Sequence, residues 1–248
     1  MQKLMGQMRA ALEKYEMIES GDRIAVGVSG GKDSLVLLAG LARLRAFYPK
    51  PFTLVAITAD PGFPGEPTDY APVSRLCAAL GVEHHIRKTQ LYRVIFEERK
   101  EKNPCSMCAR MRRGLLHNMA LEHDCRRIAL GHHEDDAVET FFMNLLEGGR
   151  LGCFSPKSYL SRRDLWLIRP MIFCAERDIA SAARRNGLPL IKSACPVDGA
   201  TRRQSMKRYI GELERTVPDL KAKVMGALSR GALDGWNADS TPPTDHLD

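Results

Sequence analysis

Residues 29–34 read SGGKDS and combine the side chains and the backbone freedom that a phosphate-binding loop needs. The loop consists of Ser29, Gly30, Gly31, Lys32, Asp33 and Ser34. Adjacent glycines let the backbone turn tightly and point N–H groups at an anion. The serine hydroxyls can donate hydrogen bonds, and Lys32 can neutralise phosphate charge. We therefore predict that this loop binds phosphate.

The residues on either side of the loop favour this interpretation. An apolar, β-rich run, Arg23 to Val28, precedes it, and the helical pattern LVLLAGLARLRAF follows. A helix that begins here adds the partial positive charge of its N-terminus, and Asp33 in its first turn could cap it. The loop is not the GxxxxGK[ST] P-loop, because Val26 stands where glycine is needed and Asp33 follows the lysine. An ordinary turn into a capped helix is the alternative.

Acidic residues follow two other expected strands. Asp60 ends an apolar run, and residues 131–140 read GHHEDDAVET. Magnesium at a nucleotide is typically held by one or two carboxylates and by phosphate oxygens. We expect Asp60, Asp135 and Lys32 to be catalytic, with Asp135 as a magnesium ligand. Asp136 and Glu139 fit such a role, and they fit stabilisation of a helix N-terminus equally well. The HHxxD string alone is weak support for zinc.

The chain has an odd number of cysteines, namely Cys77, Cys105, Cys108, Cys125, Cys153, Cys174 and Cys195. Cys105 and Cys108 form CSMC, a spacing that redox pairs and half zinc sites share. Cys195, in SACP, is a third candidate ligand. It reaches the same edge of the sheet if the preceding expected strand lies beside the first strand. Three thiolates would leave one metal position open, as in catalytic sites. We expect the other four cysteines to pack in apolar surroundings.

The chain is basic, with 37 Lys and Arg against 30 Asp and Glu. An excess of this size suits a polyanionic partner and suits simple solubility equally well. The clustered basic residues are Arg110, Arg112, Arg113, Arg162, Arg163, Arg184, Arg185, Arg202, Arg203, Lys207 and Arg208. As a set they could contact RNA phosphates, which position an RNA without reading its sequence. The aromatic content of 6% argues against a broad base-stacking surface.

Residues 1–20 form a charged, amphipathic pattern without the apolar centre of a secretory signal. No apolar run approaches the length of a membrane span. We therefore expect a cytoplasmic protein without a membrane partner. In a reducing compartment, clustered cysteines more often bind metal or do chemistry than form disulfides.

Strand-like and helix-like segments alternate along the chain. Expected strands are 23–28, 52–59, 84–87, 127–131, 166–169 and 189–192, and expected helices are 70–80, 92–102, 109–122, 134–146 and 176–186. Residues 104–108 are expected to break the helical pattern. The alternation predicts an α/β fold with a doubly wound, mainly parallel sheet, in which ligands bind beyond the carboxyl ends of the strands. We expect an N-terminal helix (1–20), a nucleotide-binding domain with an inserted CxxC segment (21–195), a C-terminal helical segment (196–235) and a disordered tail (236–248).

The SGGKDS loop after a short strand resembles the PP-loop ATP pyrophosphatases. The resemblance implies cleavage of ATP between its α and β phosphates and adenylation of an oxygen. GHHEDDAVET resembles a second signature, shared by tRNA lysidine synthetases and tRNA thiolases of the TtcA type. Arg169, in IRPM, resembles an arginine near the nucleotide in those enzymes, so residues 29–34 and Arg169 are expected to bind ATP.

The segment CSMCARMRRGLL resembles the CxxC segment of the TtcA family, the tRNA 2-thiocytidine synthetases. With ALGHHEDDAVETFFMNLLEGG, SPK and IRPM following in order, the match runs from about Asp22 to Arg208. It implies a [4Fe–4S] cluster on Cys105, Cys108 and Cys195, with one iron free to carry sulfur. The sequence departs from the family around Cys195, where one cysteine stands in place of a second CxxC.

The resemblance predicts an ATP- and Mg²⁺-dependent tRNA thiolase that adenylates a cytidine oxygen and replaces it with cluster-borne sulfur. Expected partners are tRNA and a sulfur donor such as a cysteine desulfurase, and a homodimer is allowed. One alternative is a lysidine synthetase-like enzyme with an amine nucleophile, although those enzymes lack CSMC. Two others are a thiolase that uses a cysteine persulfide and no cluster, and a non-catalytic, redox-sensing RNA-binding module.

Overall fold

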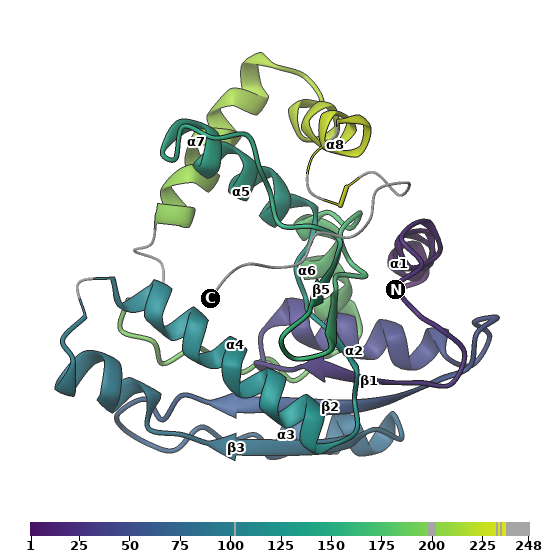
Figure 1. Ribbon diagram of the computed structural model, residues 1–248, viewed down its shortest axis with the longest axis vertical. Helices are drawn as coiled ribbons and strands as arrows, with labels where there is room; N and C mark the ends of the chain where they lie inside the picture. The colour runs from purple at the N-terminus through teal and green to yellow at the C-terminus, as the bar shows by residue number, and fades with distance from the viewer. Residues whose placement is uncertain (102, 198–201, 232, 234, 237–248) are drawn as a thin grey trace.

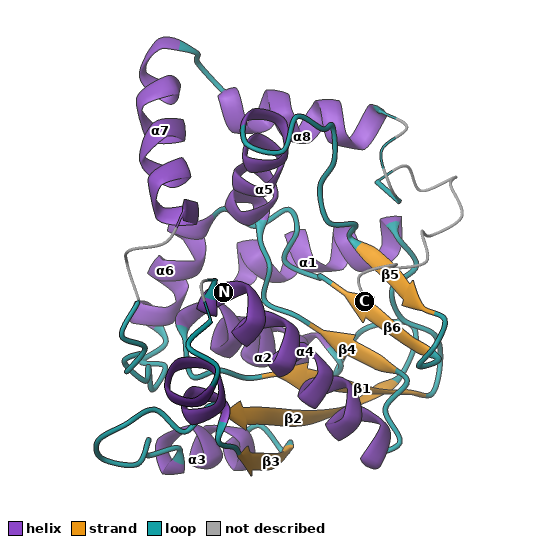
Figure 2. Ribbon diagram, turned by 60° about the vertical axis from the view of Figure 1, so that its left-hand side comes forward, coloured by secondary structure: helices purple, strands orange, loops and turns teal. Residues whose placement is uncertain are grey.

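The computed structural model describes residues 1–101, 103–197, 202–231, 233, 235 and 236 (Figure 1). Its centre is a six-stranded sheet in the order β3-β2-β1-β4-β6-β5 (Figure 2). The strands are β1 (Asp22–Gly27), β2 (Phe52–Asp60), β3 (Glu83–Lys88), β4 (Arg127–Ala129), β5 (Lys157–Leu160) and β6 (Leu165–Ile168). All neighbouring pairs are parallel except β5 with β6. The predicted doubly wound, mainly parallel fold is confirmed.

The sheet changes direction between β1 and β4. From β1 the chain proceeds to β2 and β3 on one side, and it then returns to β4 on the other side of β1. The loops that leave β1 and β4 therefore diverge at the carboxyl edge of the sheet. This topological switch point is where α/β sheets bind ligands.

Helices cover both faces of the sheet. They are α1 (Gln2–Lys14), α2 (Lys32–Leu44), α3 (Ala71–Ala79), α4 (Pro104–Glu122), α5 (Glu134–Leu146), α6 (Glu176–Arg185), α7 (Arg202–Thr216) and α8 (Leu220–Arg230), with a π-helical turn η1 (Arg93–Glu98). Ile24 and Val26 of β1 belong to the apolar core with α1, α2 and α6. Ala25 between them faces the opposite core, with Met119 and Ala120 of α4. This alternation follows the two-residue period of a strand.

The C-terminal helices stand apart from the sheet. Figure 1 shows α7 and α8 beside α5, above the layers that flank the strands. Trp236, which we placed in a disordered tail, is instead fully buried, and its indole N–H donates to the Phe154 carbonyl oxygen at 3.0 Å. The remainder of the expected tail, residues 237–248, lies outside the described residues. None of the described helices is both long and apolar enough to cross a membrane.

Three local expectations were wrong. The CSMC segment does not interrupt a helix, because α4 begins at Pro104. Proline suits the first turn of a helix, where an N–H would have no partner. Residues 189–192 form no strand, and the antiparallel strand β5 was not expected. In place of the helix expected over 92–102, the described residues 93–101 form η1 and irregular backbone.

Candidate nucleotide site and cysteine site

The phosphate loop connects β1 to α2 and is held by its own serines. The Ser34 hydroxyl donates to the Gly31 carbonyl oxygen at 2.9 Å and accepts from the Ser29 N–H at 3.1 Å. Gly31 is the N-cap of α2, and no side chain caps this helix. The first-turn N–H groups thus face the loop opening with the helix dipole behind them, which favours an anion.

Gly30 allows another segment to approach the loop. Its φ of +82° suits glycine, and a Cβ there would lie 2.8 Å from the Cβ and Cδ1 of Ile191. The Ile191 N–H also donates to the Gly30 carbonyl oxygen at 2.9 Å. Residues 189–192 therefore run beside the phosphate loop, although they are not a strand, and they bring Cys195 to the same edge of the sheet.

A cavity of about 300 Å³ opens beside the loop at the switch point. Its lining includes Ser29, Asp33 and Ser34 of the loop region and Gly131 and Asp136 after β4. A Cβ on Gly131 would lie 3.2 Å from the backbone of Asp33, so a small residue is needed where the two loops meet.

Helix α4 closes another side of this cavity with Arg112 and Leu116. The same helix carries Cys105 and Cys108 among its first five residues. One element thus contributes both to this cavity and to the cysteine pair.

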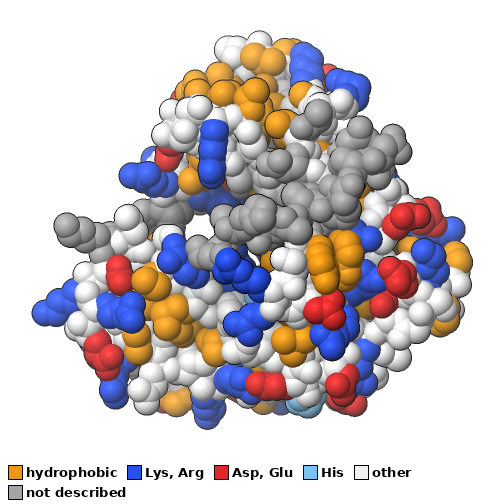
Figure 3. All heavy atoms as spheres, viewed as in Figure 1, with side chains coloured by type: hydrophobic (Ala, Val, Ile, Leu, Met, Phe, Trp, Pro, Cys, Tyr) orange, Lys and Arg blue, Asp and Glu red, His pale blue; other side chains and the backbone are white. Residues whose placement is uncertain are grey.

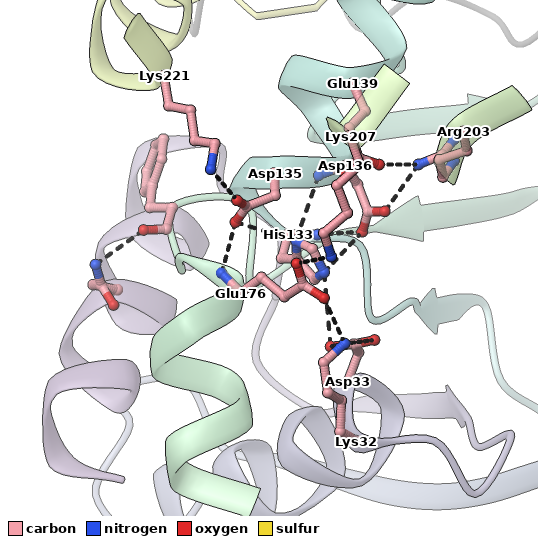
Figure 4. Close-up of polar contacts among 12 residues, drawn as sticks. Lys32, Asp33, His133, Asp135, Asp136, Glu139, Glu176, Arg203, Lys207 and Lys221 are labelled. Carbon is pink, nitrogen blue, oxygen red and sulfur yellow. Dashed lines mark hydrogen bonds and ion pairs between the residues drawn. The ribbon is translucent and has the colours of Figure 1, made fainter. Parts of the chain in front are cut away.

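Next to the cavity, a network of ion pairs surrounds Lys32 (Figure 4). The Lys32 ammonium lies 3.0 Å from a carboxylate oxygen of Asp33 and 3.0 Å from Oε1 of Glu176, the first residue of α6. The other oxygen of Glu176 contacts the ammonium of Lys207 from α7. Glu176 also donates its backbone N–H to Oδ2 of Asp135 at 2.6 Å.

The C-terminal helices contribute two further cations to this network. Arg203 of α7 lies 2.8 Å from Oδ1 of Asp136 and 3.6 Å from Oε2 of Glu139. Lys221 of α8 lies 2.9 Å from Oδ1 of Asp135. The structure therefore brings Lys32, Asp33 and Asp135 together with cations that we had considered only for RNA binding or not at all.

These contacts set the charges of the site. Burial raises the pKa of Glu176, but hydrogen bonds from Lys207 and Lys32 outweigh it and lower the pKa to about 2. Burial lowers the pKa of Lys32, yet Asp33 and Glu176 raise it above its ordinary value. Burial opposes ionisation of Asp135 as well, and Lys221 and the Glu176 N–H still lower its pKa. All three groups are charged at neutral pH.

Glu139, unlike these three groups, has a pKa shifted against its charged form. Burial and then the neighbouring Asp136 raise its pKa to about 7. Its side chain is 7% exposed, and Arg203 compensates its charge only in part. Glu139 therefore titrates near neutrality within the site.

The two histidines of the second motif are structural neighbours of the site. His133 caps α5, with the Asp136 N–H donating to its Nδ1 at 3.4 Å. His132 lines the cavity, and burial followed by Arg169 lowers its pKa to about 3, so it is neutral.

Asp60 and Arg169 lie away from the ion-pair network. The Asp60 carboxylate accepts from the Gly62 N–H at 3.1 Å. Burial raises the pKa of Tyr70, and the Asp60 charge raises it further. Arg169 is buried, lies over the Phe154 ring at 5.0 Å from its centroid, and donates to the Ser155 carbonyl oxygen at 2.5 Å.

The seven cysteines fall into two groups. Cys105, Cys108 and Cys195 are exposed or half-buried, whereas Cys77, Cys125, Cys153 and Cys174 are buried. Burial raises the pKa of Cys77 and Cys125 to about 11 and of Cys153 and Cys174 to about 12, which disfavours thiolates there.

Cys105 and Cys195 both act on the charge of the Cys108 thiol. Burial raises the pKa of Cys108, Arg112 opposes this effect, and the thiols of Cys195 and Cys105 raise it further. Within the described part of the chain, no three His, Cys, Asp or Glu side chains converge on a single metal ion. Cysteine thiolates are the ligands that [4Fe–4S] clusters take.

The chain is similar to known proteins over most of its length. The sequence profile of the PP-loop domain matches residues 2–213. The chain is 39% identical to the tRNA-cytidine(32) 2-sulfurtransferase of Geobacter metallireducens, over 92% of this chain and 89% of that protein. It is 41% identical to the enzyme of that name from Syntrophotalea carbinolica, over 88% of this chain and 85% of that protein.

The chain belongs to the PP-loop family and, within it, to the tRNA-cytidine(32) 2-sulfurtransferases. Among solved structures, this PP-loop protein is similar to the U34-tRNA thiolase NcsA from Methanococcus maripaludis with its [4Fe–4S] cluster. The TM-score is 0.72 at 26% identity, and the match covers 88% of this chain and 75% of that one. The resemblance to the TtcA family is confirmed.

Sequence reasoning missed Glu176 and Lys221 and assigned Lys207 and Arg203 to RNA alone. Glu176 carries a weak local signal, because it opens an amphipathic helix after IRPM with acidic residues in its first turn. The cations of α7 and α8 have no such signal, because their partners lie on distant segments.

Proposed function

We propose that this protein is an ATP-dependent thiolase that replaces the C2 oxygen of a tRNA cytidine, at position 32, with sulfur. The observation that carries the proposal is the double role of α4. Its N-terminal end holds Cys105 and Cys108, and Arg112 and Leu116 of the same helix line the nucleotide cavity. A base that enters between them can meet the α-phosphate of ATP and a sulfur donor without moving.

In the first half-reaction, the cytidine oxygen attacks the α-phosphorus of ATP and pyrophosphate leaves. We assign binding of the phosphates to residues 29–34, through the N–H groups at the start of α2, the Ser34 hydroxyl and Lys32. Preorganised donors of this kind stabilise the charge that develops on the leaving pyrophosphate. The base then carries AMP on the former carbonyl oxygen.

Magnesium would be held beside the phosphates by Asp135, with Asp136 as its neighbour. Their chemistry suits it, because Mg²⁺ prefers a few carboxylates and phosphate oxygens. Lys221 and Arg203 now neutralise these two carboxylates. We assign Asp60, which lies at the end of β2 and outside the ion-pair network, to the rim of the site, and Arg169 to positioning of His132 at the cavity.

In the second half-reaction, sulfur displaces AMP. A [4Fe–4S] cluster bound at the accessible cysteines, with one iron not held by cysteine, would supply sulfide as the nucleophile. Cys105, Cys108 and Cys195 are the proposed ligands, because the other four cysteines are buried thiols. Arg112 favours the thiolate of Cys108 and also lines the nucleotide cavity. It therefore lies between the nucleotide cavity and the cysteine site.

Partners follow from this chemistry. Sulfur consumed in each turnover must be supplied by a donor such as a cysteine desulfurase, and cytoplasmic tRNA is the substrate. We also propose a homodimer.

The test is nucleoside analysis of tRNA from a strain that lacks the gene and is complemented with wild type or Cys108→Ala. We expect 2-thiocytidine to disappear on deletion and to return only with wild type. Loss of lysidine with 2-thiocytidine intact would instead identify an amine-transferring enzyme. Full activity of Cys108→Ala would contradict the assigned sulfur site.

A further inference from the structure

Glu176 joins two lysines that come from opposite ends of the chain. One carboxylate oxygen lies 3.0 Å from the ammonium of Lys32 in the phosphate loop, and the other contacts Lys207 of α7. The Glu176 and Lys32 side chains are only 22% and 29% exposed. Charges in such a position are screened by salt much less than charges on the open surface.

Glu176 is also fixed at its backbone. It opens α6, and its N–H donates to Asp135 at 2.6 Å. Figure 4 shows its side chain reaching from α6 toward Lys32 and Lys207. Because the backbone is anchored, the balance between the two lysines decides where the carboxylate, and with it the Lys32 ammonium, comes to rest.

The charges around Lys32 explain why a second lysine is needed. Two carboxylates of the PP-loop body contact Lys32, and three more belong to the same ion-pair network. The lysines and the arginine that pair with these carboxylates, apart from Lys32 itself, come from α7 or α8. The carboxylates are Asp33, Asp135, Asp136, Glu139 and Glu176, and the cations are Arg203, Lys207 and Lys221. Uncompensated carboxylates would repel a triphosphate and compete with it for Lys32.

We propose that Glu176 and Lys207 are positioning residues for Lys32 in the cleavage of ATP. Lys207 takes up one oxygen of Glu176, so that the other oxygen holds Lys32 at the phosphate loop without neutralising it fully. Lys32 can then exchange Asp33 for a phosphate oxygen while it stays on Glu176. Helix α7 thus takes part in the nucleotide half-reaction through Glu176. The inference rests on the proposed function only in taking Lys32 as a phosphate ligand.

Single substitutions provide the first test, with AMP formation in the presence of tRNA as the readout. Glu176→Gln and Lys207→Gln should each lower kcat/KM for ATP by about tenfold or more, since small displacements of a reacting charge are costly. Lys3→Gln is the matched control, because Lys3 of α1 forms an ion pair at 2.7 Å with Asp178, which lies on the same helix as Glu176. It should leave kcat/KM unchanged. Wild-type kcat/KM in Glu176→Gln would overturn the proposal.

A charge swap separates positioning from simple docking of α7 on α6. In Glu176→Lys with Lys207→Glu the ion pair is restored, but the new lysine faces Lys32. We expect the single variants to have a lower melting temperature and the swap to restore it, while AMP formation stays low. Recovery of both would show that the pair is only structural and would overturn the proposal.

A double-mutant cycle gives the same information without the swap. If Lys207 acts through Lys32, Lys207→Gln should have little further effect in a Lys32→Gln background, whereas independent effects would multiply. Multiplying effects would contradict the proposal. The dissociation constant of Mg-ATP is measured in the same variants. It tests the positioning of Lys32 even if the wild-type protein thiolates no tRNA. Failure of the proposed function is therefore recognised separately from failure of this proposal.

Discussion

At the scale of single residues, the phosphate loop depends on close approach at Gly30. An alanine there needs a φ of +82° and would place its Cβ 2.8 Å from Ile191. The conformation alone costs on the order of 1–3 kcal/mol, and the overlap adds to it. Gly30→Ala should therefore lose ATP binding, measured by equilibrium titration. Gly187→Ala shares the positive φ without a nearby atom, and it should bind ATP like the wild type.

Glu139 makes stability depend on pH. Its folded-state pKa, about 7, lies above the ordinary value of 4.5. The stability associated with its protonated form is therefore fully present below about pH 4.5 and is lost as pH rises through about 7. The difference amounts to about 3 kcal/mol. Denaturant unfolding of Glu139→Gln and wild type should show the wild type losing stability relative to the variant over that window, and parallel curves would contradict this account.

The residue scale also shows what sequence alone can predict. The SGGKDS loop and the motif after β4 were predictable because their chemistry is local, with glycines, hydroxyls and a lysine inside one turn. The pairing of Lys32 with Glu176, and of Asp135 with Lys221, was not. These pairs join residues far apart in the chain, and only the packing of α6 and α8 brings them together.

At the scale of elements, α4 places the cysteine pair beside the nucleotide cavity. Iron content of anaerobically purified protein tests the ligands. Changing Cys105, Cys108 or Cys195 to alanine should remove the cluster, because each supplies a thiolate. Cys174→Ala should retain it, since Cys174 is fully buried with a pKa raised to about 12 by burial. Full iron in Cys195→Ala with loss in Cys174→Ala would show that the third ligand is misassigned.

Two elements explain why sequence patterns misled us near this site. The apolar residues at 189–192 look like a strand, yet Ile191 packs on Gly30 and donates its N–H to that loop rather than to a strand. Pro104 looks like a helix breaker, and it instead occupies the first turn of α4. In both cases tertiary contact or position within the helix decided the outcome.

At the scale of the whole molecule, basic side chains gather on the face over α4, beside a hollow below the C-terminal helices (Figure 3). Arg110 is exposed on α4, on the opposite side of the sheet from α1. Arg110→Gln should weaken tRNA binding at low salt and reduce the salt slope by about one, as expected when one phosphate contact is lost. Arg9→Gln on α1 should change neither. Equal effects of the two variants in filter binding would contradict an RNA surface over α4.

The central claim is that one base meets ATP and sulfur in turn at the carboxyl edge of the sheet. The most direct measurement follows the oxygen that leaves the base. A tRNA with ¹⁸O at C2 of cytidine 32 is incubated with anaerobic protein, Mg-ATP and a sulfur donor, and the products are analysed by mass spectrometry. We expect one ¹⁸O in AMP for each 2-thiocytidine formed, because the base oxygen attacks the α-phosphorus and departs with it. Label in pyrophosphate or water, or ADP in place of AMP, would contradict the account.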